Sequence, residues 1–392
     1  MIHPLKVNID KLVGYKIEIY PTEEQKLAIQ QAIDTFRSVY NLALEFQQTS
    51  YESGEGFISR FAMISKLTAL RREDPNYAWL NNITVGMIQN AVFNLNDTFQ
   101  YFFSKRNKYP KFKSKKRSKK SFETRADRCI IYQDYISISG IGHVDAKSHH
   151  IPIGSKLYNT VVTYDGFNRY YFSCNIECEM IDMSDVPKSE IIGVDVGIRN
   201  MITTSDGEIY KFPDTNKYEK RMKRQQRRLQ KYYNRYLQES IRTRTKYEDI
   251  PKSKNMQKKL YELHKTYAKI SNKINNDANV ATKRIVDKNP KCIVIESISV
   301  KEQQSKQPWL KKHAPHMMYY TLHRQIQYKA ARRGIPVIKA DENYPSSQIC
   351  SRCGNIRKTR HTIYNCPLCG LKLDRDINAA INLRNLAYQT TL

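Results

Sequence analysis

Two pairs of cysteines near the C-terminal end of the sequence constrain its folding more than any other feature. Each pair has the spacing Cys-x-x-Cys, twelve residues separate the pairs, and a glycine follows each one: the pairs are Cys350 with Cys353, and Cys366 with Cys369. Two such turns bring four thiolates into a tetrahedral arrangement, which is a common ligand set for zinc. Because thiols fill all four positions and leave none open for water, we predict a structural Zn²⁺.

The other four cysteines show no such spacing. Cys129, Cys174, Cys178 and Cys292 lie singly in strand-like segments. A chain of 392 residues can bury a sizeable core and does not need disulfides to fold. We therefore interpret these four as small buried apolar residues of a protein in a reducing compartment.

The charge balance of the chain indicates a polyanionic partner. There are 66 Lys and Arg against 38 Asp and Glu, a net charge of +28. A membrane surface is the competing explanation, but no apolar run approaches the roughly 20 residues of a spanning helix, and the N-terminus lacks the apolar core of a signal peptide. We expect a soluble intracellular protein without a membrane partner, and its length predicts two or three domains.

The first half of the sequence predicts a small sheet with helices inserted into it. Residues 15–20 alternate as a half-buried strand does, and Thr22 with Gln25 forms a capping-box pattern at the start of a helix. A second helical face covers residues 85–102, and we expect the two helices to pack together. Asp165-Gly166, between alternating runs, predicts a hairpin of a small β-barrel or sheet.

Two segments carry an excess of positive charge and are candidate phosphate contacts. Residues 105–120 hold ten Lys or Arg and no acid; such a run is usually just solvated, but the aromatic residues within it favour a phosphate-contacting loop. The predicted helix 217–238 is basic on nearly every side, which favours contact with a duplex over a solvated bridging helix. The candidate contacts are Lys105, Arg106, Lys108, Lys111, Lys113, Lys115, Lys116, Arg117, Arg221, Arg224, Arg227 and Arg228.

Three acidic positions stand at the ends of separate elements. One apolar strand ends on Asp195 and a second ends on Glu296, while either Asp374 or Asp376 opens a helix near the C-terminus. Asp195 alone is as well explained by a structural role, as a turn residue or as half of a salt bridge, as by a catalytic role. Together the three acids are the ligand set of an RNase H-like site, in which two Mg²⁺ ions, or Mn²⁺ in their place, promote phosphodiester hydrolysis. In this interpretation Asp195 bridges both ions.

The order of these motifs resembles the TnpB family, RNA-guided nucleases encoded by small bacterial transposons and related to Fanzor proteins and type V CRISPR effectors. The likeness rests on GVDVG, IVIES, YPSSQICSRCG, CPLCG and DRDINAAINLRN, with YKIEIYPTEEQ and KYPKFKSKK earlier in the same order. It implies that the third acid is Asp376, two residues before the Asn of the D-x-N-A-A pattern, beside Asp195 and Glu296. It also implies Mg²⁺-dependent cleavage of double-stranded DNA matched by a guide RNA, next to a short duplex motif.

The resemblance further implies a fold class and an order of domains. The expected fold is α/β plus β: an RNase H-like (RuvC) nuclease domain with an inserted zinc module, preceded by a wedge β-barrel that carries a helical recognition domain. The implied bounds are 1–20 and 107–185 for the wedge barrel, 21–106 for the recognition domain, 186–345 and 371–392 for the nuclease domain, and 346–370 for a zinc module that contacts target nucleic acid. We expect a monomer in the bacterial cytoplasm, associated with the nucleoid when bound, with guide RNA and target DNA as partners.

Other functions fit parts of the sequence. A guide-RNA-dependent DNA-binding regulator would have lost cleavage, yet all three acids are present here. A nonspecific basic RNA-binding protein with structural zinc would leave the acids unexplained. A compact CRISPR-associated effector differs from the transposon-encoded form mainly in genomic context and size. The leading hypothesis is therefore an RNA-guided DNA endonuclease.

Overall fold

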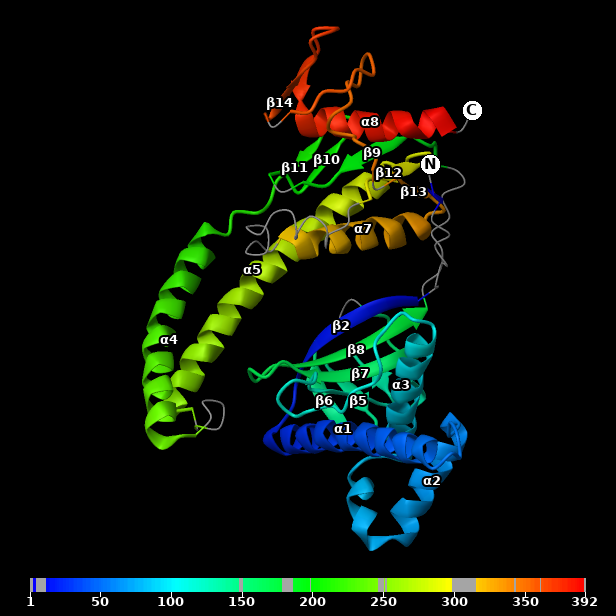
Figure 1. Ribbon diagram of the computed structural model, residues 1–392, viewed down its shortest axis with the longest axis vertical. Coiled ribbons are helices and arrows are strands. Elements are labelled where there is room, and N and C mark those ends of the chain that lie inside the picture. The colour runs from blue at the N-terminus through cyan, green and yellow to red at the C-terminus, as the bar shows by residue number, and fades with distance from the viewer. Residues whose placement is uncertain are drawn as a thin grey trace. The chain divides into compact units, whose positions relative to one another are not determined.

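The computed structural model divides the chain into two compact units. Unit 1 comprises Met1–Ile9 with Glu179–Leu392, and unit 2 comprises Asp10–Cys178. Figure 1 gives the labels of helices and strands. The structure describes residues 3–4, 12–147, 151–177, 186–197, 199–245, 250, 252–297, 315–341, 343–359 and 361–390.

Unit 2 is built on a seven-stranded antiparallel sheet with the strand order β3-β7-β8-β2-β6-β5-β4. The predicted hairpin lies between β7 and β8, where Asp165 Oδ1 accepts hydrogen bonds from the N–H groups of Phe167 and Arg169, and Gly166 has a φ of 84°. The strands are β2 (Leu12–Tyr20), β3 (Ser121–Glu123), β4 (Ile130–Ile131), β5 (Tyr135–Ile138), β6 (Gly142–Ala146), β7 (Leu157–Tyr164) and β8 (Tyr170–Glu177).

The helices of unit 2 follow the expected pattern. Thr22 caps α1 in a reciprocal capping box with Gln25, which confirms the predicted helix start. The apolar faces of α1 and α3 share one core with the inner side of the sheet, as expected from their spacing. The helical elements are α1 (Glu23–Glu52), α2 (Arg60–Glu73), α3 (Val85–Phe103) and the 3₁₀ turns η1 (Pro75–Asn82) and η2 (Ala126–Arg128).

Unit 1 is built on a six-stranded mixed sheet with the order β1-β13-β12-β9-β10-β11. β9, β12 and β13 are parallel, and β10 and β11 continue the sheet in antiparallel orientation. β1 pairs with β13, so His3 and Pro4 belong to unit 1 and not to the wedge barrel, where we expected them from the sequence. A two-residue edge strand is too short to show a periodic pattern in the sequence. The strands are β1 (His3–Pro4), β9 (Ile192–Asp195), β10 (Ile202–Thr204), β11 (Ile209–Tyr210), β12 (Ile293–Ile295) and β13 (Val337–Lys339).

Helices cover both faces of the unit 1 sheet. α5 (Lys254–Asp287) and α7 (Pro315–Ala331) lie on one face and α8 (Arg375–Thr390) lies on the other (Figure 1). The central strand β12 alternates accordingly: Ile293 and Ile295 pack among residues of α5 and α7, whereas Val294 packs with Leu383 of α8. Residues buried on both sides explain why the sequence of this strand is continuously apolar.

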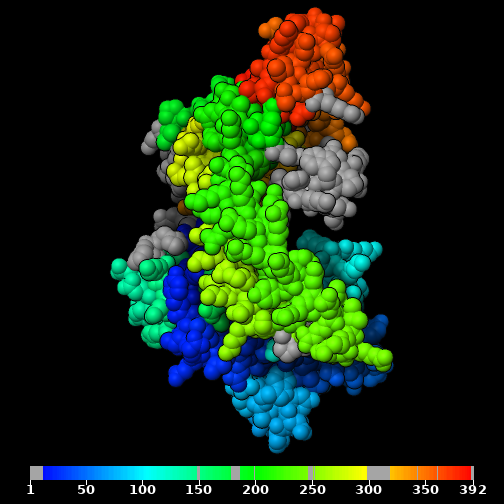
Figure 2. All heavy atoms as spheres, turned by 90° about the vertical axis from the view of Figure 1, so that its left-hand side faces the viewer, coloured from blue at the N-terminus to red at the C-terminus, as the bar shows by residue number. Residues whose placement is uncertain are grey.

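α4 (Asn216–Thr243) packs along α5. The sequence predicted a helix that is basic on nearly every side, and the structure differs because a narrow stripe of a few buried and partly buried apolar residues suffices for this contact. The remaining surface of α4 is exposed along its length (Figure 2, green). The stripe consists of Met222, Leu229, Tyr232, Tyr233 and Tyr236 of α4 with Met256, Leu260 and Leu263 of α5.

The four-cysteine segment forms a small module between β13 and α8. It contains the antiparallel hairpin of β14 (Ile363–Asn365) and β15 (Lys372–Asp374). Cys129, Cys174 and Cys292 are buried outside this module, as predicted, while Cys178 lies outside the described residues. Among the described residues, none of the helices combines the length and apolarity that a membrane crossing needs.

Candidate functional site

The register of two parallel strands places Asp195 beside Glu296. β9 and β12 pair Val294 with Gly193 and Ile295 with Val194, so Glu296 and Asp195 are the next residues on neighbouring strands. Because side chains alternate along a strand and Val294 points toward α8, both carboxylates turn toward the α8 face at the end of the sheet.

A close approach between β9 and α8 brings the third acid to the same place. A Cβ atom on Gly193 would lie 2.0 Å from the carbonyl oxygen of Ala380, so only glycine allows the helix to pack at this distance. The side chain of Asp374 accepts a hydrogen bond of 2.9 Å from the N–H of Asp376 and so caps the start of α8. Asp376 therefore lies in the first turn of α8 and is only 6% exposed.

The electrostatics show that the three acids interact. Burial raises the pKa of Asp195 well above its ordinary value, and the carboxylates of Glu296 and Asp376 raise it further. Burial also raises the pKa of Glu296 to about 7, against the opposing effect of hydrogen bonds from Tyr319 and the backbone of Val196. The structure thus brings the three predicted acids together, and their catalytic role remains a prediction.

Three further side chains contact these acids. The guanidinium of Arg199 donates to Asp374 at 2.7 Å and to Asp376 at 3.0 Å, and the amide of Asn200 donates to Asp376 at 3.3 Å. The hydroxyl of Tyr319 on α7 lies 3.2 Å from Glu296 Oε1 and also contacts the carbonyl oxygen of Val196.

Sequence reasoning assigned no role to these three residues. Arg199 and Asn200 follow Asp195 closely in the sequence, and this proximity could have indicated that they lie near the acids. Tyr319 comes from a helix that is distant in sequence, and no motif indicated its contact.

The donor set fits divalent metal ions that prefer oxygen ligands. Carboxylates are hard oxygen donors, as Mg²⁺ and Mn²⁺ require. Ionisation of all four carboxylates would leave more negative charge than the two guanidinium groups beside Asp374 and Asp376 neutralise, and divalent ions would balance this excess. The groups are Asp195, Glu296, Asp374 and Asp376, with Arg199 and Arg375.

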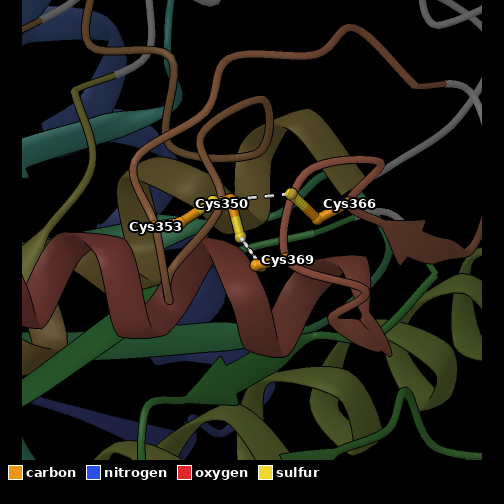
Figure 3. Close-up of side chains that lie close together, drawn as sticks. All are labelled: Cys350, Cys353, Cys366 and Cys369. Atoms are coloured by element: carbon orange, nitrogen blue, oxygen red, sulfur yellow. Dashed lines mark hydrogen bonds between the residues drawn. The ribbon is translucent and has the colours of Figure 1, made fainter.

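The four cysteine sulfurs converge as the spacing predicts (Figure 3). Their sulfur atoms all lie within 4.8 Å of one another. No other group of three or more His, Cys, Asp or Glu side chains in the described part of the chain is as close. The carboxylates of the acid site are therefore spaced more widely than the sulfurs. The sulfurs of Cys350 and Cys369, and those of Cys353 and Cys366, lie 3.5 Å apart. A disulfide needs about 2 Å, whereas four sulfurs at about 2.3 Å from a zinc ion lie roughly 3.8 Å apart.

One thiol of the cluster, Cys366, is shifted toward its thiolate form, while the pKa of Cys353 is raised to about 12. Hydrogen bonds from the backbone N–H groups of Cys369 and Leu368 lower the pKa of Cys366 to about 6. A thiolate is the form that binds zinc. The chemistry and spacing of the cluster therefore fit Zn²⁺.

The predicted basic contacts lie on exposed surfaces, with one exception. Lys113 is partly buried, its Nζ lies 3.6 Å from the ring centroid of Tyr40, and burial lowers its pKa to about 8. Lys115 is exposed but lies 3.5 Å from Asp34. The remaining candidates are exposed on the segment after α3 or on α4: Lys105, Arg106, Lys108, Lys111, Lys116, Arg117, Arg221, Arg224, Arg227 and Arg228.

Two family models match the chain. A helix-turn-helix domain of IS605 OrfB proteins matches residues 11–56, a range that includes β2 and α1. The TNB domain of Cas12f1-like proteins matches residues 319–383, from α7 through the four cysteines into α8.

Several known proteins are similar over most of the chain. A Streptomyces pristinaespiralis protein, provisionally named an RNA-guided DNA endonuclease, is 26% identical over 94% of this chain and 88% of its own. The Escherichia coli K12 protein InsQ, with the same provisional name, is 24% identical over 95% of this chain and 92% of its own. A solved Cas12f1 complex with single-guide RNA and target DNA covers 95% of this chain and 99% of its own, at 16% identity and a TM-score of 0.36.

The fold and its two clusters define a mixed α/β protein with interacting carboxylates at the end of a sheet and a four-cysteine module inserted before its last helix. The chain belongs to the TnpB family, also called IS605 OrfB, and is related to Cas12f. The resemblance first noted in the sequence motifs is thereby confirmed.

Proposed function

We propose that the chain is an RNA-guided DNA endonuclease that hydrolyses phosphodiester bonds at Asp195, Glu296 and Asp376. The observation that carries this proposal is the convergence of three mutually repelling carboxylates, of which Asp376 is buried and Asp195 and Glu296 are partly buried, from two strands and a helix. The names of the relatives support the guide RNA and the DNA substrate. A basic RNA-binding protein without catalysis would have no use for a charge cluster that costs stability.

The proposal extends to the architecture. Unit 1, with parallel β9, β12 and β13 continued by antiparallel β10 and β11, corresponds to the RNase H-like (RuvC) domain interrupted by the zinc module. In unit 2, the sheet corresponds to the wedge barrel, and α1 to α3 correspond to the helical recognition domain. These correspondences follow the domain order of the family.

The protein groups around the acids have separate roles in this proposal. Bound Mg²⁺ or Mn²⁺ would act as a Lewis acid and lower the pKa of a water that attacks the phosphodiester. Asp195, Glu296 and Asp376 would hold the ions, and their partial or full burial limits the access of bulk water to the carboxylates. The hydroxyl of Tyr319 holds Glu296 in place, whereas Arg199 neutralises part of the charge of Asp376 until a metal ion replaces it.

The exposed basic surfaces would bind the phosphates of guide RNA and target DNA. Four arginines are exposed on one stretch of α4 and form no ion pair with any residue that the structure describes: Arg221, Arg224, Arg227 and Arg228. Their charges therefore remain available to a polyanion. We propose a monomer as the active form.

The test combines the identification of bound RNA with a cleavage assay. RNA that copurifies with the chain is sequenced to identify the guide. Plasmids that contain the sequence matching this guide, flanked by randomised sequence, are then incubated with the protein and Mg²⁺. The wild type should cut only matched plasmids, and Asp195→Asn should abolish cutting while it retains the RNA. Asp277→Asn, on α5 and outside the acid cluster, serves as the matched control. Undiminished cutting by Asp195→Asn would refute the proposed site.

A further inference from the structure

We propose that Asn378 and Asn382 are positioning residues that link the four-cysteine module to the acid site, so that zinc binding at the cysteines fixes Asp376 for metal binding. The inference rests on the proposed function because it takes Asp376 to be a metal ligand. It adds a dependence of one metal site on the other.

The first turn of α8 grows directly out of the cysteine module. β15 ends at Asp374, pairs with β14 through Ile363, and leads without a loop into the helix. The N–H of Arg375 donates to the carbonyl oxygen of Thr362 at 2.9 Å. Asp376 is therefore the second residue of a helix whose start belongs to the module.

One turn further on, two buried amides fasten α8 to the first Cys-x-x-Cys turn. Asn378, which is fully buried, accepts a 3.0 Å hydrogen bond from the N–H of Ser351 and donates a 2.7 Å bond to the carbonyl oxygen of Ile349. These two partners flank Cys350. Asn382, 3% exposed, donates to the carbonyl oxygens of Ser346 and Ile349 at 2.7 Å each.

The opposite side of α8 rests on the sheet. Ala380 and Leu383 pack there, and the absence of a side chain at Gly193 allows close contact. Asp376, four residues before Ala380, lies on this sheet-facing side, whereas Asn378 and Asn382 share the module-facing side. The helix is thus held between the sheet and the cysteine turn, and a shift of that turn would shift Asp376.

The apolar core of the cysteine module is too small to hold the first Cys-x-x-Cys turn in place. Its buried core consists of Cys350, Tyr364 and Cys366, with Cys369 and Leu371 partly buried against them. Apolar clusters of this size do not fold stably without a metal or another covalent or coordinate link. Zinc on the thiols would therefore hold the residues on both sides of Cys350, which the two amides contact.

The consequence is measurable as metal affinity. Loss of a group that orients a metal ligand typically weakens metal binding about 10- to 100-fold. Asn382→Asp keeps the shape of the side chain but replaces both N–H donations with repulsion between oxygens. Asn378→Ser is a second, milder variant, because its hydroxyl can still accept from the N–H of Ser351. Asn385→Asp makes the same chemical change on α8 without a recorded contact to the module and is the matched control.

The experiment measures Mn²⁺ binding to the full chain by electron paramagnetic resonance, with zinc content measured in parallel. Asp195→Asn defines which binding belongs to the acid site. We expect Asn382→Asp to weaken that binding about tenfold or more, Asn378→Ser to weaken it less, and Asn385→Asp to leave it unchanged. Wild-type protein that has been freed of zinc and desalted should show the same loss of Mn²⁺ affinity. Removing zinc from Asn382→Asp should weaken its Mn²⁺ binding little further.

The outcomes separate the two proposals. Mn²⁺ binding of wild-type strength in folded Asn382→Asp and in the zinc-free wild type would overturn the link between the sites. A purely structural role would lower the thermal stability of both asparagine variants without changing Mn²⁺ affinity, and this result would also overturn it. Absence of any Asp195-dependent Mn²⁺ binding in the wild type would instead overturn the proposed acid site itself.

Discussion

Replacing Asp195 by asparagine should stabilise the folded chain at neutral pH when divalent ions are absent. Burial and mutual repulsion raise the pKa of Asp195, and burial takes the pKa of Glu296 from 4.5 to about 7. A carboxyl group whose pKa is raised by folding favours the folded state fully below its unfolded pKa, and this contribution is lost as the pH rises through the folded pKa. The wild type should therefore lose stability between about pH 4.5 and about pH 7.

The size of the effect follows from the shift at Glu296. An increase from 4.5 to about 7 corresponds to ~3 kcal/mol, and Asp195 adds to it. For a unit of roughly 200 residues, 1 kcal/mol changes Tm by about 2–4 °C. The Tm of the metal-free wild type should thus fall by roughly 6–12 °C between about pH 5 and about pH 8. Asp195→Asn removes one charge and its repulsion of Glu296, so its fall should be clearly smaller.

Scanning calorimetry of zinc-loaded protein in buffers otherwise free of divalent ions provides the assay. Mg²⁺ should raise the Tm of the wild type more at about pH 8 than at about pH 5, because ions bind deprotonated carboxylates. The same addition should leave Asp195→Asn nearly unchanged, while Asp277→Asn should follow the wild type. A wild-type Tm that is independent of pH and equal to that of Asp195→Asn would refute the electrostatic reasoning.

Four further predictions follow from individual contacts. Gly193→Ala should destabilise unit 1 by about 1–3 kcal/mol in urea unfolding and displace Asp376, because its Cβ would collide with the backbone of α8; wild-type stability would contradict this. Arg199→Gln should tighten Mn²⁺ binding about two- to fivefold by calorimetric titration, since it removes a competing cation; weaker binding would show that Arg199 supports the site instead. Cys366→Ser should purify without stoichiometric zinc by mass spectrometry, and full zinc content would exclude the four-thiolate site. Arg224→Gln should reduce the slope of log affinity for RNA against log salt by about 0.7–0.9, and an unchanged slope would remove this residue from the contacts.

Much of the fold could be predicted because the spacing of apolar residues and the residues that begin or end helices and strands indicate the same elements. The capping box at Thr22, the Asp165-Gly166 turn and the helical face of α3 each determine a local structure, and the structure contains all three. The four sulfurs could be predicted to converge because each Cys-x-x-Cys turn brings two thiols to one side and only twelve residues separate the turns.

Other features depend on contacts that no local pattern shows. The convergence of the acids depends on the register between β9 and β12 and on the approach of α8 to Gly193, both of which are set by tertiary packing. Tyr319 reaches Glu296 from α7, a helix in which no sequence motif marks this residue. The apolar stripe on α4 was missed because a few large residues in a strongly basic helix are enough to form it.

Anomalous X-ray diffraction from crystals of the chain grown with Mn²⁺ tests the central claim most directly. We predict manganese density in contact with the carboxylates of Asp195, Glu296 and Asp376, and none at this position in crystals of Asp195→Asn. Manganese bound elsewhere on a chain that still cuts guide-matched DNA, with no density between these three acids, would contradict the account.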